Sequence, residues 1–459
     1  MTTRRDILRT MSAFAGAGLA SAALPGFAAM ARQGGSPGGY KALVCVFLAG
    51  GMDGHDTVIP QDADSYAEWA DVRSSLLGLY ARAGNTGRQR EQLAPLGALG
   101  DGREFGMPPE MRRLADLYRE GRMAVVANVG PLVVPTTGAE ARAKRVPLPP
   151  KLMSHNDQQS VWQALGPEGA TLGWGGRMID VLGAAPSPYA AVSAAGNPVF
   201  LAGRGATPLV VGTGEIEEVV YNSATWSHGS PDVPEALREH FSASASQVNN
   251  LLASDFQNAQ RESVRTINEL AGVASGVTAG QGIVIEGNDL SEQLAAVARM
   301  ISLRGELGLG RQVFFVKMGG FDTHQDQHRD LPGLQRGLAE ALAAFYRWTE
   351  SAGLGSAVTT FTASDFGRTL TTNANGTDHG WGNHHLVLGG AVRGGRIIGQ
   401  MPSTVVDHAQ DFGRGRLVPN LATSQYAASL GRWFGLSDGQ LSDVLPGLSR
   451  FDSRAVTLF

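Results

Sequence analysis

Short apolar runs, each closed by glycine or by polar residues, recur along the chain. They are too short for a core helix, and several end in a pair of glycines. Runs of this kind predict strands that are buried on both faces, as in a parallel sheet. The predicted strands lie in residues 41–51, 123–130, 208–214, 311–320, 356–367 and 385–392.

Longer stretches with apolar residues at helical spacing separate these runs. They predict helices in residues 107–122, 157–165, 244–272, 290–307 and 334–354. Strands that alternate with helices predict an α/β fold, in which a mainly parallel sheet is sandwiched by helices. Residues near 60–110 and 185–285 interrupt the alternation. We expect them to be insertions that form a cap on one domain spanning residues 40–459.

The first residues have the layout of an export signal. The paired arginines of "TRRDILR" precede a mildly apolar, Ala/Gly-rich stretch, and "AMA" offers a cleavage site after Ala31. The pair Arg4-Arg5 indicates the twin-arginine export machinery as a partner and a periplasmic or secreted location. Residues 1–31 are the predicted signal peptide and 32–39 a linker. The alternative is a weak N-terminal anchor helix, but the apolar stretch is short for a stable transmembrane anchor.

Composition narrows the classes of function. The chain has 459 residues, 43% of them hydrophobic and 17% charged, with a formal net charge of −4. No basic run is present, so we expect no nucleic-acid partner. The single cysteine, Cys45, lies inside an apolar run, where it is expected to be a small core residue.

Side chains that bind metals gather directly after the predicted strands. Five of the ten histidines fall between residues 324 and 385. Parallel sheets bind ligands beyond the carboxyl ends of their strands, so we expect these side chains to converge in one crevice. The candidate residues are Asp53, His55 and Asp56 after the first run, Asp322, His324, Asp326 and His328 after the run at 311–320, Asp365 and Arg368 after the run at 358–364, and Asp378, His379, His384 and His385 further on.

Aspartate oxygen combined with imidazole nitrogen suits Zn²⁺ or Mn²⁺ better than Ca²⁺. Converging carboxylates repel one another unless cations lie among them. We therefore predict one or two divalent ions, and Arg368 is expected to hold an anionic substrate oxygen through its bidentate fork. The candidate metal ligands are Asp53, Asp322, His324, His328, Asp365, Asp378, His379 and His384.

Each candidate also has an ordinary structural interpretation. An aspartate at a strand end, such as Asp53, is a common helix N-cap. His55 is equally explained as a surface loop residue, and Asp326 with His328 as the solvated start of a helix. Arg368 is equally explained as a structural bridge to a neighbouring carboxylate.

The adjacent pair His384 and His385 presents a choice. Neighbouring residues of a strand face opposite ways, so only one of the two imidazoles points into the site if the pair opens a strand. His384 is preferred because it precedes the apolar run.

Several longer motifs together resemble a bacterial family of exported proteins called domain of unknown function 1501. They are "LAGGMDGHDTVIP", "SHNDQQSVWQ", "GGFDTHQDQH", "SDFGRT" and "GTDHGWGNHHLVLGGAVRGG". The similarity covers nearly the whole mature chain, and the family is in turn similar, at the level of fold, to the alkaline phosphatase and sulfatase superfamily. The resemblance implies an alkaline-phosphatase-like fold, with Asp53, Asp322, His324 and Asp365 in the order of that superfamily's site.

The chain departs from the superfamily pattern in two places. Asp365 is followed by phenylalanine where the superfamily commonly has histidine, so the missing imidazole would come from His379. Asp322 and His324 are two residues apart, whereas the superfamily's pair is usually four apart; Asp322 with Asp326, or His324 with His328, would restore that spacing.

The resemblance also implies a nucleophile at the start of a helix. Ser154 in "KLMSHNDQQSVWQ" occupies that region, and a helix N-terminus favours an anion there. Ser154 also fits a plain N-cap, with Asp157 at the capping-box position. His155 is expected to be a general acid or a further ligand.

These features predict an exported, metal-dependent hydrolase whose substrate is an anionic ester of phosphate or sulfate. Ser154, His155 and Arg368 are the candidate catalytic residues. The alternative is a non-catalytic periplasmic or surface protein that retains a sulfatase- or phosphatase-like fold.

Overall fold

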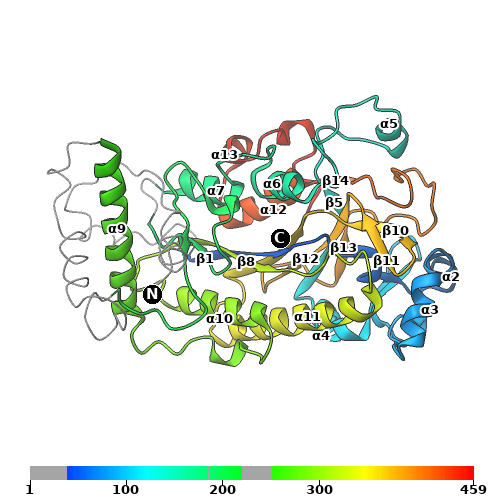
Figure 1. Ribbon diagram of the computed structural model, residues 1–459, viewed down its shortest axis with the longest axis horizontal. Coiled ribbons are helices and arrows are strands. Elements are labelled where there is room, and N and C mark those ends of the chain that lie inside the picture. Colours follow the sequence, from blue (N-terminus) through cyan, green and yellow to red (C-terminus); the bar gives the residue numbers. More distant parts are fainter. Residues whose placement is uncertain (1–38, 184–186, 220–250) are drawn as a thin grey trace, which may run out of the picture.

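The computed structural model describes residues 39–183, 187–219 and 251–459. The predicted signal peptide (residues 1–31) and most of the predicted linker lie outside the described residues. The described chain forms an α/β fold around a central sheet with helices on both faces (Figure 1). The predicted α/β architecture, with a sheet sandwiched by helices, is therefore confirmed.

The central sheet has nine strands in the order β13-β5-β12-β9-β1-β8-β6-β7, with β14 paired to β5. Neighbouring strands are parallel except at β12, which is antiparallel to both β5 and β9. The sheet is thus mixed and mostly parallel. Its strands are β1 (Lys41–Leu48), β5 (Met123–Gly130), β6 (Ala191–Ser193), β7 (Leu209–Val210), β8 (Arg311–Met318), β9 (Val358–Ser364), β12 (Asn383–Leu388), β13 (Arg396–Ile398) and β14 (Leu421–Ala422).

Alternate residues of the central strand β1 enter two different hydrophobic cores. Val44 and Val46 face one core, and Leu43 and Phe47 face the other, because successive side chains of a strand point to opposite faces. The first core is covered by α4 (Arg112–Arg119), α10 (Asp289–Ser302) and α11 (Gln327–Ser351). The second is covered by α6 (His155–Ala164), α7 (Trp174–Leu182), α12 (Thr423–Phe434) and α13 (Asp438–Val444). Burial on both faces explains why the sequence of β1 is continuously apolar.

Cys45 is buried in β1, where it packs with the second core, and burial raises the pKa of its thiol. It lies in the core as the sequence predicted. Across the described ranges, no helix is both long and apolar enough to cross a membrane.

The described parts of the two expected insertions lie at opposite ends of the sheet (Figure 1). The first contains α2 (Ala63–Val72), α3 (Ser74–Arg82) and a small antiparallel sheet of β2 (Ile59–Pro60), β3 (Ala94–Ala98) and β4 (Glu104–Met107). The second contributes β6 and β7 to the edge of the central sheet, followed by α9 (Leu251–Ala274). Part of the second insertion therefore extends the sheet itself instead of covering it.

The parallel strands at the centre of the sheet end in register. Leu48 at the end of β1 pairs with Met318 of β8 and with Ser364 of β9. The loops that follow these three strands therefore leave from one edge of the sheet. A hairpin of β10 (Arg368–Asn373) and β11 (Gly376–His379) follows β9 directly and pairs Arg368 with His379. The segment after β5 carries the short helix α5 (Gly138–Arg142) and leads to α6.

Candidate functional site

Three imidazoles converge on the carboxylate of Asp322 at this edge of the sheet. His324 follows β8 in the same loop as Asp322, His379 ends β11, and His155 is the first residue of α6. Oδ1 of Asp322 lies 3.1 Å from Nε2 of His379 and 3.2 Å from Nε2 of His324. Oδ2 lies 3.5 Å from Nε2 of His155. The two nitrogens of His324 and His379 are themselves only 2.8 Å apart.

Each imidazole is held from behind through its other ring nitrogen. Nδ1 of His379 lies 2.7 Å from the carbonyl oxygen of Met153, and Nδ1 of His155 lies 2.6 Å from Asp365. Nδ1 of His324 lies 3.5 Å from Asp378. A backbone carbonyl or carboxylate at Nδ1 is the usual partner of a metal-binding histidine, because it fixes the tautomer and aims Nε2 at the ion.

The tautomer of His379 follows from these contacts. Burial lowers the pKa of His379, so the neutral imidazole is favoured. A carbonyl oxygen only accepts hydrogen bonds, and Nδ1 must therefore carry the hydrogen that is donated to Met153. Nε2 of His379 is then a bare lone pair that faces the nitrogen of His324 and the oxygen of Asp322.

A cation satisfies this arrangement better than protons do. A single hydrogen on Nε2 of His324 would have to serve both Nε2 of His379 and Oδ1 of Asp322. The triangle formed by these three atoms has sides of 2.8, 3.1 and 3.2 Å. Ligand atoms about 2.0–2.1 Å from a tetrahedral Zn²⁺ ion are separated by roughly 3.3 Å, so the triangle is slightly smaller than that of a metal site. His155, Asp322 and His379 also place ligand atoms within 4.8 Å of one another.

Arg368 lies beneath the carboxylate of Asp322. Its Nη1 donates to Oδ1 at 2.8 Å, and its side chain is 0% exposed while that of Asp322 is 46% exposed. Burial works to raise the pKa of Asp322, but the hydrogen bond and charge of Arg368 outweigh it, and the pKa is lowered. Nη2 of Arg368 is buried and has no hydrogen-bond partner among the described residues. Of the terminal groups of the guanidinium, Nη2 is thus the one left unpaired in the described part of the chain.

Two acidic residues stand behind the histidines rather than beside Asp322. Asp365 is fully buried, and its Oδ2 accepts from Gln159 at 3.0 Å as well as contacting His155. Asp378, behind His324, accepts from Asn373 at 2.6 Å and pairs with Arg414 at 2.7 Å. The hydrogen bond to Asp365 is the main reason that the pKa of His155 is raised.

A family model described as a protein of unknown function, DUF1501, matches residues 40–447. The chain belongs to the DUF1501 family. A comparison of this DUF1501 protein with curated proteins gives no match.

Three candidate ligands of the DUF1501 protein lie away from the histidine cluster. Asp53 is buried in an ion pair with Arg73, at 2.7 Å, and it also caps the short helix Gly54–Asp56. Nδ1 of His384 accepts the backbone N–H of Asn128 within the sheet. His328 packs edge-on against the ring of Tyr80. The structure therefore brings together Asp322, His324 and His379, with Asp365 and Asp378 behind them.

Ser154 precedes the first helical residue of α6, but its hydroxyl makes no capping bond to the helix backbone. Instead Oγ donates to Oδ2 of Asp157 at 2.8 Å. The neighbouring Met153 has a φ of 70°, a conformation that L-residues rarely adopt, and its carbonyl is the one that holds His379.

The groups that support the cluster could hardly be predicted from the sequence. The carbonyl of Met153 has no side-chain signature, and Gln159, Asn373 and Arg414 are ordinary polar residues in sequence. The four-residue spacing from His155 to Gln159, on one face of α6, is the single signal that was available.

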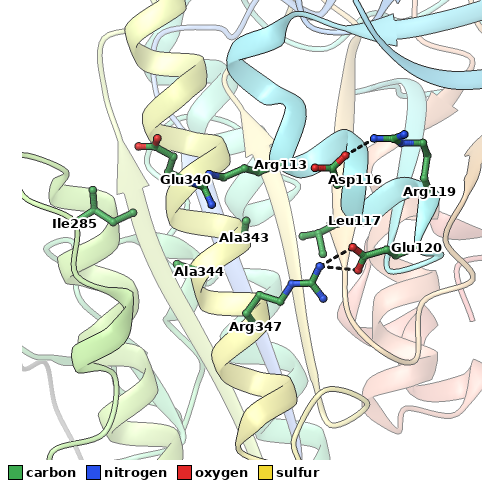
Figure 2. Close-up of a pocket in the computed structure, with 10 residues that line it drawn as sticks. All are labelled: Arg113, Asp116, Leu117, Arg119, Glu120, Ile285, Glu340, Ala343, Ala344 and Arg347. Atoms are coloured by element: carbon green, nitrogen blue, oxygen red, sulfur yellow. Dashed lines mark hydrogen bonds and ion pairs between the residues drawn. The ribbon is translucent and has the colours of Figure 1, made fainter.

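A cavity of about 710 Å³ lies elsewhere, between α4 and α11 (Figure 2). Among its lining residues, Asp116 pairs with Arg119 and Glu120 pairs with Arg347. It is lined by residues of the helices that cover the first core, and no member of the histidine cluster borders it. The acidic groups that Figure 2 shows in these ion pairs, Asp116 and Glu120, thus already have basic partners.

Proposed function

We propose that this protein is an exported, metal-dependent hydrolase of phosphate or sulfate esters that works with one divalent ion, Zn²⁺ or Mn²⁺. The observation that carries the proposal is the meeting of Asp322, His324 and His379, whose ligand atoms lie 2.8–3.2 Å apart. Three protein ligands and an open position are typical of a catalytic metal site. When bound, the ion supplies Lewis acidity to the ester oxygen and makes water a nucleophile near neutral pH.

One ion, rather than two, matches the charges. The carboxylate of Asp53 is neutralised by Arg73, whose side chain is fully buried with it. Asp378 is paired with Arg414, and Asp365 contacts His155. Asp322 is therefore the carboxylate left to share its charge between Arg368 and an ion. These ion pairs support a single metal site built on Asp322. We propose a likeness to the alkaline phosphatase and sulfatase superfamily only for this metal site.

Arg368 and His155 supply the remaining chemistry. The free Nη2 group of Arg368 donates to an anionic oxygen of the ester, which explains a preference for phosphate or sulfate. His155 lies on the other oxygen of Asp322, and the proximity of Asp365 favours its protonated form. We assign to it the donation of a proton to the leaving oxygen.

Export by the twin-arginine route remains part of the proposal. It rests on the pair Arg4-Arg5 and the cleavage site after Ala31, both outside the described residues. Substitution of both arginines by lysine should leave the uncleaved precursor in the cytoplasm, which fractionation and mass measurement would detect. A normal periplasmic yield of the double variant would contradict the route.

Metal content and turnover test the function together. We expect the protein purified without chelator to carry close to one equivalent of Zn²⁺ or Mn²⁺ and to hydrolyse p-nitrophenyl phosphate, bis(p-nitrophenyl) phosphate or p-nitrophenyl sulfate. Asp322→Asn should lose both the ion and the activity. Asp438→Asn makes the same chemical change at an exposed ion pair and should keep both. Metal without turnover of any ester would instead support the non-catalytic alternative.

A further inference from the structure

We propose that a buried chain of hydrogen bonds, running from Asp53 through Gln327 and Thr377, holds Arg368 in the orientation that the site requires. The inference rests on the proposed function, because Arg368 is the residue of that site which contacts both Asp322 and the ester. It gives Asp53 a role as an anchor of the site. Asp53, Gln327 and Thr377 are positioning residues.

The chain of hydrogen bonds begins at the buried carboxylate of Asp53. Arg73 donates to both oxygens of Asp53, at 2.7 and 3.1 Å, and neither side chain is exposed. The same guanidinium donates to the backbone carbonyls of Thr369 and Leu370, at 3.0 and 3.1 Å. Asp53 is therefore fixed relative to the start of β10, the strand that carries Arg368.

Gln327 connects Asp53 to Thr377. Its Nε2 donates to Oδ2 of Asp53 at 2.7 Å. Because an ionised carboxylate only accepts hydrogen bonds, the nitrogen of the Gln327 amide, and not its oxygen, must face Asp53. Its Oε1 is then turned toward Thr377, whose hydroxyl donates to it at 2.8 Å. The hydroxyl of Thr323 approaches the same oxygen at 3.2 Å. Gln327 and both threonines are buried, so water does not compete for these groups.

Thr377 connects the amide to the guanidinium. Because its hydrogen is donated to Gln327, its oxygen is free to accept, and Nε of Arg368 donates to it at 3.3 Å. Nη1 of Arg368 then reaches Asp322 at 2.8 Å, and Nη2 is the group left without a partner. Every link pairs one donor with one acceptor. The three nitrogens of the planar guanidinium thus have separate roles. Nε donates to Thr377, Nη1 donates to Asp322, and Nη2 is left for the ligand.

The hydrogen bonds of the described residues connect the chain to His379 through Arg368 and Asp322. A substitution inside it should therefore change the site without removing a ligand. Partners that orient metal ligands typically change metal affinity by about 10–100-fold when they are mutated. We expect Thr377→Val, which keeps the shape of the side chain and removes the hydroxyl, to weaken Zn²⁺ affinity by about 10-fold or more.

The experiment compares Thr377→Val with Thr377→Ser and with Thr359→Val. Serine keeps the hydroxyl and should restore wild-type behaviour. Thr359 is buried in β9, and its hydroxyl has no hydrogen-bond partner in the described part of the chain, so it is a matched control for the same chemical change. Zn²⁺ affinity is measured by competition with a chelator, thermal unfolding is recorded for each variant, and the ¹H–¹⁵N signal of the Arg368 Nε–H group is followed by NMR.

The proposal expects weaker Zn²⁺ binding and a shifted Arg368 signal in Thr377→Val, with neither change in Thr377→Ser or Thr359→Val. Equal affinities and an unmoved signal in Thr377→Val would overturn it. If the wild-type protein binds no Zn²⁺ or Mn²⁺, the proposed function fails by itself. The NMR signal of Arg368 then tests the hydrogen-bond chain without any metal. A signal that moves in Thr377→Val and not in Thr359→Val supports the chain. A signal that stays in place in Thr377→Val refutes it.

Discussion

Nδ1 of His155 and Oδ2 of Asp365 lie 2.6 Å apart, although the two residues are separated by 210 positions in the sequence. Asp365 is fully buried and His155 is the first residue of its helix, so the carboxylate fixes the direction in which the imidazole points. The other nitrogen of the ring is thereby aimed at Asp322. In the proposed function, Asp365 is therefore the residue that orients the proton donor His155.

Asp365→Asn should therefore impair proton donation selectively. We expect turnover of phenyl phosphate to fall by about 10²-fold or more, the usual contribution of general acid catalysis, with a smaller loss on p-nitrophenyl phosphate. The reason is that the nitrophenolate leaving group needs little protonation. Steady-state kinetics on both esters checks this. Gln159→Met is the control, because it removes the other hydrogen bond to the same oxygen of Asp365 and leaves the carboxylate in place. Equal losses on both esters would contradict the assignment.

His155 and His324 should differ in what their loss removes. We predict that His324→Asn lowers metal affinity severely, because it deletes a ligand and leaves Asp322 facing a bare nitrogen. His155→Asn should keep the ion and lose turnover. Elemental analysis of both variants, together with the ester assays, separates the roles. Loss of the ion from His155→Asn would make His155 a ligand as well.

Much of the fold was predictable because its strands are buried on both faces. The run at 311–320 became β8 and the run at 41–51 became β1, since continuous apolar sequence has few other stable outcomes in a sheet covered by helices. The direction of β12 was not predictable. An apolar run carries no information on strand polarity, and the strand proved antiparallel to both neighbours.

The site was predictable where the topology alone decides. Asp322 and His324 follow a central parallel strand, and the rule on strand ends placed them at the edge where the structure has them in contact with His379. The partner of Asp53 could not be predicted, because Arg73 lies in the insertion and nothing in its local sequence points to Asp53. The burial of His384 could not be predicted either, because the start of the strand was not known. β12 begins at Asn383, so His384 lies within the strand and not before it.

Buried neutral histidines should make the protein sensitive to acid. Burial lowers the pKa of His55 to about 3, of His384 to about 4 and of His385 to about 3. In the unfolded chain these groups titrate near 6.5, so on acidification the unfolded state binds protons first. Stability is complete above pH 6.5 and falls as the pH drops toward 4. At pH 5 each group costs about 2 kcal/mol of unfolding free energy.

Thermal unfolding between pH 7.5 and 4.5 measures this effect. We expect the midpoint to fall steeply below pH 6.5, and His385→Phe to make the decline shallower. Phenylalanine preserves the ring packing of His385 against Trp162 and Tyr426 and removes the titrating group. An unchanged slope in this variant would show that His385 is not one of the groups responsible.

Asp53→Asn tests whether Asp53 is a ligand or an anchor. Removing one charge from this buried pair leaves Arg73 with Asp56, at 3.7 Å, as its remaining acidic partner, and we expect a loss of up to about 3–5 kcal/mol in the free energy of unfolding. The amount of bound metal should stay at one equivalent when the ion is in excess. Asp101→Asn, at a partly exposed pair with Arg103, should cost only about 0–1 kcal/mol. A loss of metal stoichiometry in Asp53→Asn would restore Asp53 as a ligand.

Ser154→Ala decides which group attacks the ester. Oγ of Ser154 already donates to Asp157 at 2.8 Å, and in the proposed function the nucleophile is water. We therefore predict that Ser154→Ala keeps its metal and retains turnover within a few-fold of wild type, because the hydroxyl makes no capping bond whose loss would unfold α6. Ser160 lies in the same helix, and its hydroxyl donates to the carbonyl oxygen of Pro167 beyond the helix end. Ser160→Ala is therefore the control for general effects on α6. A serine nucleophile would behave differently, since its removal typically lowers kcat by roughly 10⁶-fold. A fall of that size in Ser154→Ala, with metal intact and Ser160→Ala active, would make Ser154 the nucleophile and would require its hydroxyl to turn from Asp157 toward the ester.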